Sequence, residues 1–335
     1  MNSPNKKTVC IAGASGLVGS NITRAALLKG YRVNGTLRDI SDPKKVPFLT
    51  ALPGGDRLTL FNADMAIEND FNKATRDVDG LFIATLIPTY QGPSGMLGKD
   101  MNDEQGYQEI IMPTVNGCLN IMRSAVANGV KKIVICSSTS STNPIPSVSI
   151  KNEVDHWSDP NEQCRAKKYT SAAKTVMEKA AFKFAREAGV RLSVIMPTGM
   201  FGPVIIPEHM ERNPHVWLKR LIGGGIGRHE QVPNDSTSMS HIHDLANLFL
   251  AAYEDPKANG RYFGVYSSWH WQDIYAEIKR ILPQMQMPMP ITDDPKPVTQ
   301  FDFTRRDSLG ASFRNIQSCL RETIEWIQAN PFDEH

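Results

Sequence analysis

Short apolar segments with strand character alternate with helical stretches through the first two thirds of the chain. The expected strands are residues 8–12, 31–36, 58–62, 80–84, 132–136 and 191–196. Helical periodicity fills most of the gaps between them, notably at residues 17–29, 109–127 and 172–188. Neighbouring parallel strands need a crossover connection, and a helix supplies it. The alternation therefore predicts an α/β fold built on a parallel sheet.

A glycine-rich segment, Gly13-Ala-Ser-Gly16-Leu-Val-Gly19, lies between the first expected strand and the helix that follows it. Missing side chains let a backbone approach a pyrophosphate, and free N–H groups at a helix N-terminus attract that anion. A purely structural tight turn is the alternative. The position between strand and helix favours a dinucleotide-binding loop. The loop would consist of Gly13, Ser15, Gly16, Leu17, Val18 and Gly19.

The residues after the second expected strand indicate which dinucleotide binds. An acidic residue there suits the ribose hydroxyls of NAD, whereas an arginine suits the 2′-phosphate of NADP. This chain has Arg38 at that place and Lys45 nearby, and a guanidinium forms paired hydrogen bonds with a phosphate. Asp39 leaves NAD open as the alternative. We predict NADP(H) as the cofactor, with Asp64 and Met65 beside its adenine.

The overall balance of residues excludes several classes of protein. Lys and Arg number 37 against 35 Asp and Glu, a net charge of +2, which gives no support for a nucleic-acid or membrane-surface partner. No apolar run approaches the roughly 20 residues of a membrane-spanning helix, and the polar residues 1–7 do not resemble a secretory signal. The five cysteines include no Cys-x-x-Cys pair, and the eight histidines show no ligand spacing. We therefore expect free thiols, no metal site and a cytoplasmic location.

Motifs spread over nearly the whole chain carry a family resemblance. They are residues 9–19, 30–39 with Lys45, 113–123, 136–138, 157–159, 164–168, Lys174 with Thr175, 197–198, 202–203 and 260–262. Together they resemble the plant dihydroflavonol reductase and cinnamoyl-CoA reductase group of the extended (atypical) short-chain dehydrogenases/reductases. The resemblance implies a Rossmann-type, doubly wound parallel sheet with a smaller C-terminal substrate-binding lobe.

Prolines and glycines interrupt the alternation of strands and helices after Pro197, as in Gly223-Gly224-Gly225. These interruptions of regular secondary structure indicate a less regular lobe attached to the sheet. We expect the NADP-binding Rossmann domain to comprise residues 1–199 with 240–265. The substrate-binding lobe would then comprise residues 200–239 with 266–335.

The resemblance also implies an activity and further cofactor contacts. Members of this group use NADPH to reduce a carbonyl, so we expect this protein to reduce a ketone, aldehyde or thioester of an apolar or aromatic small molecule. We expect it to be a monomer or homodimer. The cofactor would be bordered by Ala84 and Thr85 at the fourth strand end, and its nicotinamide by Pro197, Thr198 and Gly199. An epimerase or dehydratase of the same fold that retains NAD is one alternative, and a non-catalytic NADPH-binding protein is the other.

The family's catalytic groups are a serine, a tyrosine and a lysine, with the tyrosine four residues before the lysine on one helix. Tyrosine gives a proton to the carbonyl oxygen, lysine lowers the tyrosine pKa and holds the nicotinamide ribose, and serine orients the substrate. Ser138, after the fifth expected strand, and Lys174 match this pattern. Tyr169, however, lies five residues before Lys174, and the position four before it is Thr170.

This spacing leaves two interpretations of the catalytic tyrosine. Four residues of regular helix separate side chains by about 40°, and five by about 140°. The helix could begin after Tyr169, with Thr170 or Ser171 as N-cap, or contain a π-bulge. Alternatively the tyrosine function is lost, and Thr170 or a water molecule replaces it. We expect the first arrangement, with the Tyr169 hydroxyl near the Lys174 ammonium, and a glycine-rich lid at residues 88–105.

Overall fold

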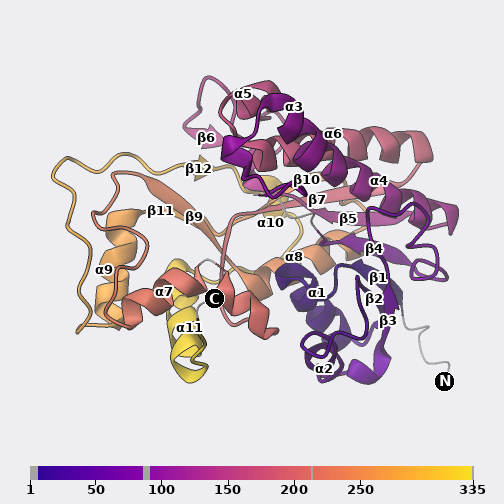
Figure 1. Ribbon diagram of the computed structural model, residues 1–335, viewed down its shortest axis with the longest axis horizontal. Coiled ribbons are helices and arrows are strands. Elements are labelled where there is room, and N and C mark those ends of the chain that lie inside the picture. Colours follow the sequence, from indigo (N-terminus) through magenta and orange to yellow (C-terminus); the bar gives the residue numbers. More distant parts are fainter. Residues whose placement is uncertain (1–6, 86–90, 213, 334–335) are drawn as a thin grey trace.

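The computed structural model describes residues 7–85, 91–212 and 214–333. Its centre is a seven-stranded sheet in which every pair of neighbours is parallel (Figure 1). The order across the sheet is β10-β7-β5-β4-β1-β2-β3. The strands are β1 (Thr8–Ala12), β2 (Arg32–Leu37), β3 (Leu58–Asn62), β4 (Gly80–Ile83), β5 (Lys132–Cys136), β7 (Arg191–Pro197) and β10 (Gly260–Gly264). The order reverses direction at β1, so the predicted doubly wound Rossmann-type sheet is confirmed.

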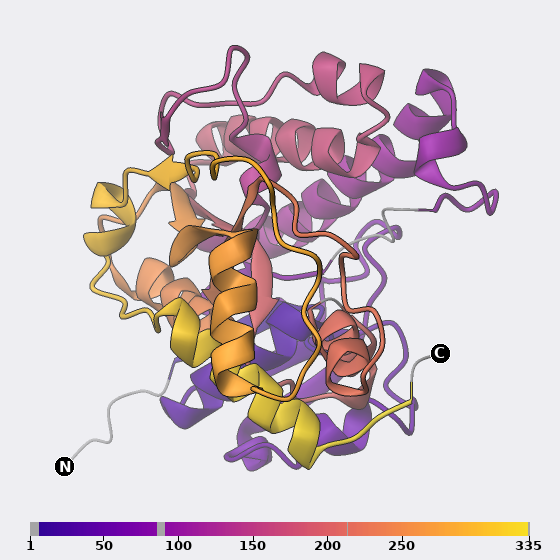
Figure 2. The ribbon, with the colours of Figure 1, turned by 90° about the vertical axis from the view of Figure 1, so that its left-hand side faces the viewer.

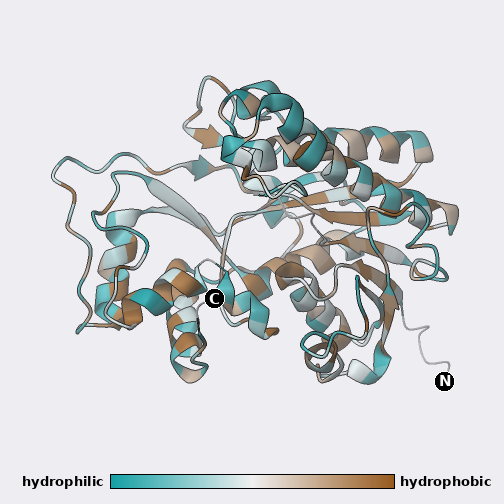
Figure 3. Cartoon of the chain, in the orientation of Figure 1, coloured by the Kyte–Doolittle hydropathy of each residue, from teal (hydrophilic) through white to brown (hydrophobic). Residues whose placement is uncertain are grey.

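Helices cover both faces of this sheet, which explains the continuous apolar character of its central strands. One face packs against α1 (Leu17–Leu28) and α8 (Ile242–Glu254), which lie side by side. The other packs against α4 (Met112–Ala127) and α6 (Tyr169–Ala188). Figure 1 shows the two helical layers on opposite sides of the strands, and Figure 3 shows apolar strands between helices whose outer surfaces are polar.

A smaller lobe flanks the sheet and has its own apolar core. It contains a second sheet of β8 (Gly199–Phe201), β9 (Ser236–His241) and β11 (Ser267–His270), and the helices α7 (His215–Ile222), α9 (Trp271–Ile281) and α11 (Ile316–Ala329). Trp217, Trp271 and Ile274 are buried in this core. Figure 2 shows α9 and α11 at the front of the lobe. The two helices that cover this side of the lobe are therefore separated in the sequence.

Shorter elements connect these bodies. They are α2 (Val46–Thr50), α3 (Asp103–Gly106), α5 (Pro160–Arg165), α10 (Thr304–Asp307), a π-helical segment at Tyr107–Ile111 and the paired strands β6 (Ile150–Lys151) and β12 (Gln300–Phe301). The β6–β12 pair joins the chain after β5 to the C-terminal segment. Within the described ranges, no helix is long and apolar enough to cross a membrane.

Candidate active site

The glycine-rich segment forms a tight loop between β1 and α1. Gly13 has φ +83°, and a Cβ there would lie 2.8 Å from Thr85 Cα at the end of β4. A Cβ on Gly19 would lie 2.0 Å from the Gly13 carbonyl oxygen. Both positions therefore require glycine, one for its backbone angle and both for the close approach of neighbouring backbone.

The loop delivers the open N-terminus of α1 to the carboxyl ends of the strands. Gly16 is the N-cap, and no side chain of the described residues caps the helix there. The first N–H groups of a helix carry a partial positive charge and need acceptors. Gly13, Ser15, Gly16, Leu17, Val18 and Gly19 thus surround an open helix terminus, and such a terminus is suited to a pyrophosphate.

The end of β2 presents Arg38 to solvent. The neighbouring Asp39 carboxylate accepts hydrogen bonds from the Ser41 amide (2.8 Å) and the Ser41 hydroxyl (2.6 Å), so it is used in a local turn. Lys45 lies in the following turn, with its ammonium 3.2 Å from Asp42. Arg38 is therefore exposed, and Lys45 is half-buried beside Asp42, whereas the Asp39 carboxylate that would serve NAD is bonded within its turn.

The ends of β3 and β4 meet beside the loop. The Thr85 hydroxyl lies 3.7 Å from the Met65 sulfur, and Met65 is buried. The Ala84 amide donates to the Ala12 carbonyl at 3.0 Å, and Asp64 accepts from the Ala66 amide at 2.9 Å. The structure thus brings Met65, Ala84 and Thr85 together next to Gly13.

Lys174 reaches the end of β5 from helix α6. The side chain is 4% exposed, and its ammonium donates to the Cys136 carbonyl at 3.1 Å. Ser138 follows two residues later as the N-cap of a short 3₁₀ turn, where its hydroxyl oxygen accepts from the Ser140 amide at 3.1 Å. Its hydroxyl hydrogen stays available for a substrate oxygen.

Strand β7 brings a further predicted segment to the same edge. The Ser137 amide donates to the Ile195 carbonyl at 2.7 Å, and Pro197 ends β7. Pro197, Thr198 and Gly199 therefore leave the sheet next to the strand that leads to Ser138.

Burial perturbs the Lys174 ammonium. It lowers the lysine pKa from its ordinary 10.5, and the nearby Cys136, Cys118 and Glu178 side chains oppose that shift. A buried lysine with a lowered pKa at a strand end is a candidate for proton transfer.

The expected irregular helix start at Tyr169, with its hydroxyl near the Lys174 ammonium, is wrong. Helix α6 begins at Tyr169 itself with Lys168 as N-cap, so neither Thr170 nor Ser171 caps it, and the π-helical segment of this region lies elsewhere, at Tyr107–Ile111. A regular helix turns the side chain five residues before Lys174 away from that lysine.

The Tyr169 hydroxyl instead binds a different part of the chain. It donates to Asp103 Oδ1 at 2.7 Å and lies 3.1 Å from the Lys167 ammonium. The ring is 1% exposed and packs on Gly106, where an added Cβ would lie 2.5 Å from it. Tyr169 therefore anchors the segment before α4 to α6.

Thr170 occupies the helical position four residues before Lys174 and is half-buried. It is on the lysine side of α6 by helical geometry. The predicted lid begins at residues 88–90, which lie outside the described residues. Its later part bonds to the π-helical segment Tyr107–Ile111, where the Ser94 hydroxyl donates to Glu109 Oε2 at 2.6 Å.

His209 is a site residue that the sequence did not reveal. It belongs to the lobe, is 6% exposed, and its Nε2 lies 3.0 Å from the Ser15 carbonyl oxygen of the glycine loop. Its Nδ1 is buried without a partner among the described residues. Burial lowers the His209 pKa to about 4, so the ring is neutral at pH 7 and can donate to that carbonyl. No sequence signal links two residues so far apart.

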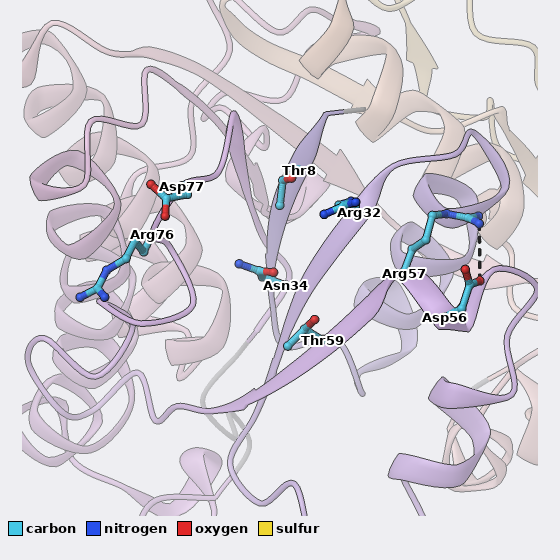
Figure 4. A pocket seen from close by; sticks show the side chains of 8 residues that line it. All are labelled: Thr8, Arg32, Asn34, Asp56, Arg57, Thr59, Arg76 and Asp77. Carbon is cyan, nitrogen blue, oxygen red and sulfur yellow. Dashed lines mark hydrogen bonds and ion pairs between the residues drawn. The ribbon is translucent and has the colours of Figure 1, made fainter. Parts of the chain in front are cut away.

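A surface hollow lies at the opposite ends of the strands (Figure 4). It is lined by Thr8, Arg32, Asn34, Asp56, Arg57, Thr59, Arg76 and Asp77. Arg57 is committed to the Leu27 carbonyl at 2.6 Å. Ligands of open α/β sheets bind at the carboxyl ends of the strands, so this hollow is not the candidate site. Across the described residues, no group of His, Cys, Asp or Glu is arranged to hold a metal ion.

Comparison with known proteins identifies the family that shares this arrangement. Residues 9–265 match the model of the NAD dependent epimerase/dehydratase family. The chain belongs to this family. The predicted resemblance to the cinnamoyl-CoA and dihydroflavonol reductases within it is confirmed.

Two relatives support the resemblance to these reductases. The chain is 30% identical to "Cinnamoyl-CoA reductase CAD2" of Medicago truncatula over 97% of its length and 96% of that protein. It is 32% identical to "Bifunctional dihydroflavonol 4-reductase/flavanone 4-reductase" of Malus domestica, over 92% of its length and 86% of that protein. The predicted oxidoreductase class agrees with both.

A solved structure has the same fold. It is the yeast methylglyoxal/isovaleraldehyde reductase Gre2 complexed with NADPH, with a TM-score of 0.77 and 19% identity. The alignment covers 96% of this chain and 98% of Gre2.

Proposed function

We propose that this protein is an NADPH-dependent reductase that converts a carbonyl group to an alcohol, or a thioester to the corresponding aldehyde with release of the thiol. The observation that carries the proposal is the meeting of Lys174 and Ser138 at the carboxyl end of β5, next to the loop of Gly13. The reductase names of the similar proteins support it.

The residues present fit a dinucleotide. The cradle at Gly13 and Gly19 would be filled by any Cβ, and the open α1 terminus suits a pyrophosphate. Arg38 and Lys45 would hold the 2′-phosphate and Lys174 the nicotinamide ribose. Asp64, Met65, Ala84 and Thr85 would border the adenine half, and Pro197, Thr198 and Gly199 the nicotinamide. When bound, NADPH supplies a hydride.

The protein's own groups manage the substrate oxygen and its proton. The Ser138 hydroxyl donates a hydrogen bond to the carbonyl oxygen and orients it. The buried Lys174 ammonium is the proton source, because burial lowers its pKa and because the Tyr169 phenol is bound to Asp103. Thr170, or a water molecule held there, passes the proton to the oxygen, since an alkanol is too weak an acid to be the source itself.

We further propose that residues 200–239 with 266–335 bind the substrate and that residues 1–199 with 240–265 bind the cofactor. The separate apolar core of the lobe supports this division. An apolar or aromatic ketone, aldehyde or thioester is the expected substrate class, because the similar proteins bear the names of enzymes for such compounds.

The proposed location is the cytoplasm, as a monomer or homodimer. All five cysteines are free thiols and four are buried, which suits a reducing compartment. Fractionation of the native host cell tests the location, and light scattering coupled to size exclusion tests the assembly.

The decisive experiment follows absorbance at 340 nm with NADPH and a panel of aromatic ketones, aldehydes and acyl thioesters. Oxidation of NADPH that depends on one compound class, and is lost in Lys174→Ala, supports the proposal. Tight NADPH binding by calorimetry with no turnover would identify a non-catalytic NADPH-binding protein. Isolation of the protein with retained NAD would identify an epimerase or dehydratase.

A further inference from the structure

Two opposite charges are buried directly behind the candidate active site. Glu178 is fully buried, Arg261 is 4% exposed, and Arg261 Nε lies 2.9 Å from Glu178 Oε2. Neither is used in the proposed proton transfer. Removing two charges from water is costly, and a well-packed apolar pair is often at least as stabilising. A gain in stability therefore does not explain why this ion pair is buried. Its contacts with the residues around Ser138 suggest another role.

The carboxylate of the pair holds the residue before Ser138. The Ser137 hydroxyl donates to Glu178 Oε1 inside the protein. Glu178 also lies four residues after Lys174 in α6, so the two side chains share one face of the helix. One carboxylate thus links the β5 end to the helix that carries the lysine.

The guanidinium of the pair holds the residues after Ser138. Arg261, in β10, donates from Nη2 to the Ser141 hydroxyl (3.0 Å) and to the Ser141 carbonyl (3.1 Å). The Ser141 hydroxyl in turn donates to the Ser138 carbonyl at 2.9 Å. Ser138 is therefore tied to the same ion pair from both sides along the chain.

The remaining surfaces of Arg261 are also occupied. Nη1 donates to the His156 carbonyl (2.9 Å) and the Glu153 carbonyl (3.2 Å), and the guanidinium lies 3.6 Å from the centre of the Trp157 ring. A planar group held by so many contacts has one orientation. The pair is accordingly a rigid reference point for the turn that carries Ser138.

We propose that Glu178 and Arg261 are positioning residues that hold Ser138 and Lys174 in one catalytic arrangement. The proposal rests on the proposed reductase function. Ser137 and Ser141 transmit the position of the pair to Ser138, and the Glu178 charge favours the protonated form of Lys174. Cys136 and Cys118 are the other groups that influence this ammonium.

The proposal predicts the direction in which the pKa of Lys174 changes when the Glu178 charge is removed. Burial raises the pKa of Glu178, while Arg261, the Ser137 and Ser141 hydroxyls and Lys174 oppose the rise. Replacing the carboxylate with an amide removes a negative neighbour from Lys174, so the lysine pKa falls. Because the reaction needs the ammonium, the decline of kcat at high pH then begins at a lower pH.

The test compares Ser137→Ala and Glu178→Gln with Glu153→Gln as the matched control. Glu153 is also buried, and its carboxylate accepts from the Phe263 amide at 3.1 Å. We expect Ser137→Ala to lower kcat roughly 10-fold and Glu178→Gln roughly 100-fold, as displaced catalytic groups do. KM should stay within about 3-fold of the wild-type value for both. Glu153→Gln should keep the kcat and pH profile of the wild type.

A double variant, Glu178→Met with Arg261→Met, separates positioning from stability. It removes both buried charges together, so neither is left unpaired while the reference point is lost. Persistently low kcat at a melting temperature near that of the wild type supports the proposal. A double variant or Ser137→Ala with wild-type kcat and pH profile overturns it.

An NMR titration of the lysine ¹⁵Nζ signals tests the pair without any substrate. The Lys174 signal is assigned by its loss in Lys174→Ala. Its pKa should be lower in Glu178→Gln than in the wild type and unchanged in Glu153→Gln. Equal Lys174 pKa values in all three proteins overturn the proposal. Absence of turnover in the wild type contradicts the reductase function alone.

Discussion

The two sides of the first turns of α6 differ in what they hold. On one side, Tyr169 is fixed to Asp103 and packs on Gly106. On the other, Lys174 points to the end of β5 and has Glu178 one turn further along. The residue types of a catalytic pair are both present, but one residue of spacing places the phenol against Asp103 and the ammonium against the Cys136 carbonyl at the end of β5. The comparison teaches that the phase of a helix decides which part of the molecule each of its side chains reaches.

The largest expected effect comes from the lysine side. Lys174→Ala should lower kcat/KM by roughly 10³-fold or more, because the residue is proposed as both the proton source and the ribose contact. Ser138→Ala should lower it only about 10- to 100-fold, since it orients the oxygen without supplying the proton. Steady-state kinetics with the substrate found in the panel measure both. Similar residual rates would contradict the assignment of roles.

The next effect concerns the cofactor that Lys174 is proposed to contact, at its 2′-phosphate end beside Arg38. NADPH should bind at least about 10-fold more tightly than NADH, about 1.4 kcal/mol, and Arg38→Ala should abolish this preference. Arg32→Ala is the matched control, because Arg32 is an exposed arginine at the other end of the same strand. Calorimetric Kd values for both nucleotides provide the measurement. A preference that persists in Arg38→Ala would remove the basis for NADP.

A smaller effect concerns the contact between the lobe and the glycine loop. His209→Ala should raise the Kd for NADPH about 3- to 10-fold, because the loop loses its hydrogen bond at Ser15. His229→Ala serves as control, since His229 bonds to Tyr275 within the lobe. Titration of NADPH fluorescence reports both values. Equal Kd values in the two variants would show that the contact does not support the loop.

The smallest effect on rate belongs to the tyrosine side. Tyr169→Phe should keep kcat within about 3-fold of the wild type, yet lower the melting temperature by roughly 2–4 °C through the lost hydrogen bond. A 100-fold loss of kcat with an unchanged melting temperature would contradict this prediction and identify the Tyr169 phenol as the proton donor.

The same variant has a pH signature. The hydrogen bonds of Tyr169 and Lys167 lower the pKa of Asp103 from 3.8. A carboxyl with a lowered folded-state pKa contributes stability above its unfolded pKa and loses it as the pH falls through the folded value. The difference in melting temperature between wild type and Tyr169→Phe should therefore be full at pH 6 and shrink below pH 3.8. A constant difference would show that the Asp103 charge is not involved.

Several parts of the fold and site were predictable because their causes are local. Gly13 and Gly19 are required by backbone geometry within a few residues of themselves. The position of Ser138 after a buried strand places it at the carboxyl edge of any parallel sheet. The helical angle between Tyr169 and Lys174 was also readable, and it already argued against the shared face that was expected.

The sequence by itself determined the alternation of strands and helices, the glycine loop and the residue types at the strand ends. Only the tertiary structure decided that Asp103 captures the Tyr169 hydroxyl, that His209 reaches Ser15, and that Arg261 meets Glu178. Periodicity and turn chemistry act over one or two turns of chain, and the sequence displays them directly. Partners of buried polar groups are set by which elements pack together, so they appear only when the chain is folded.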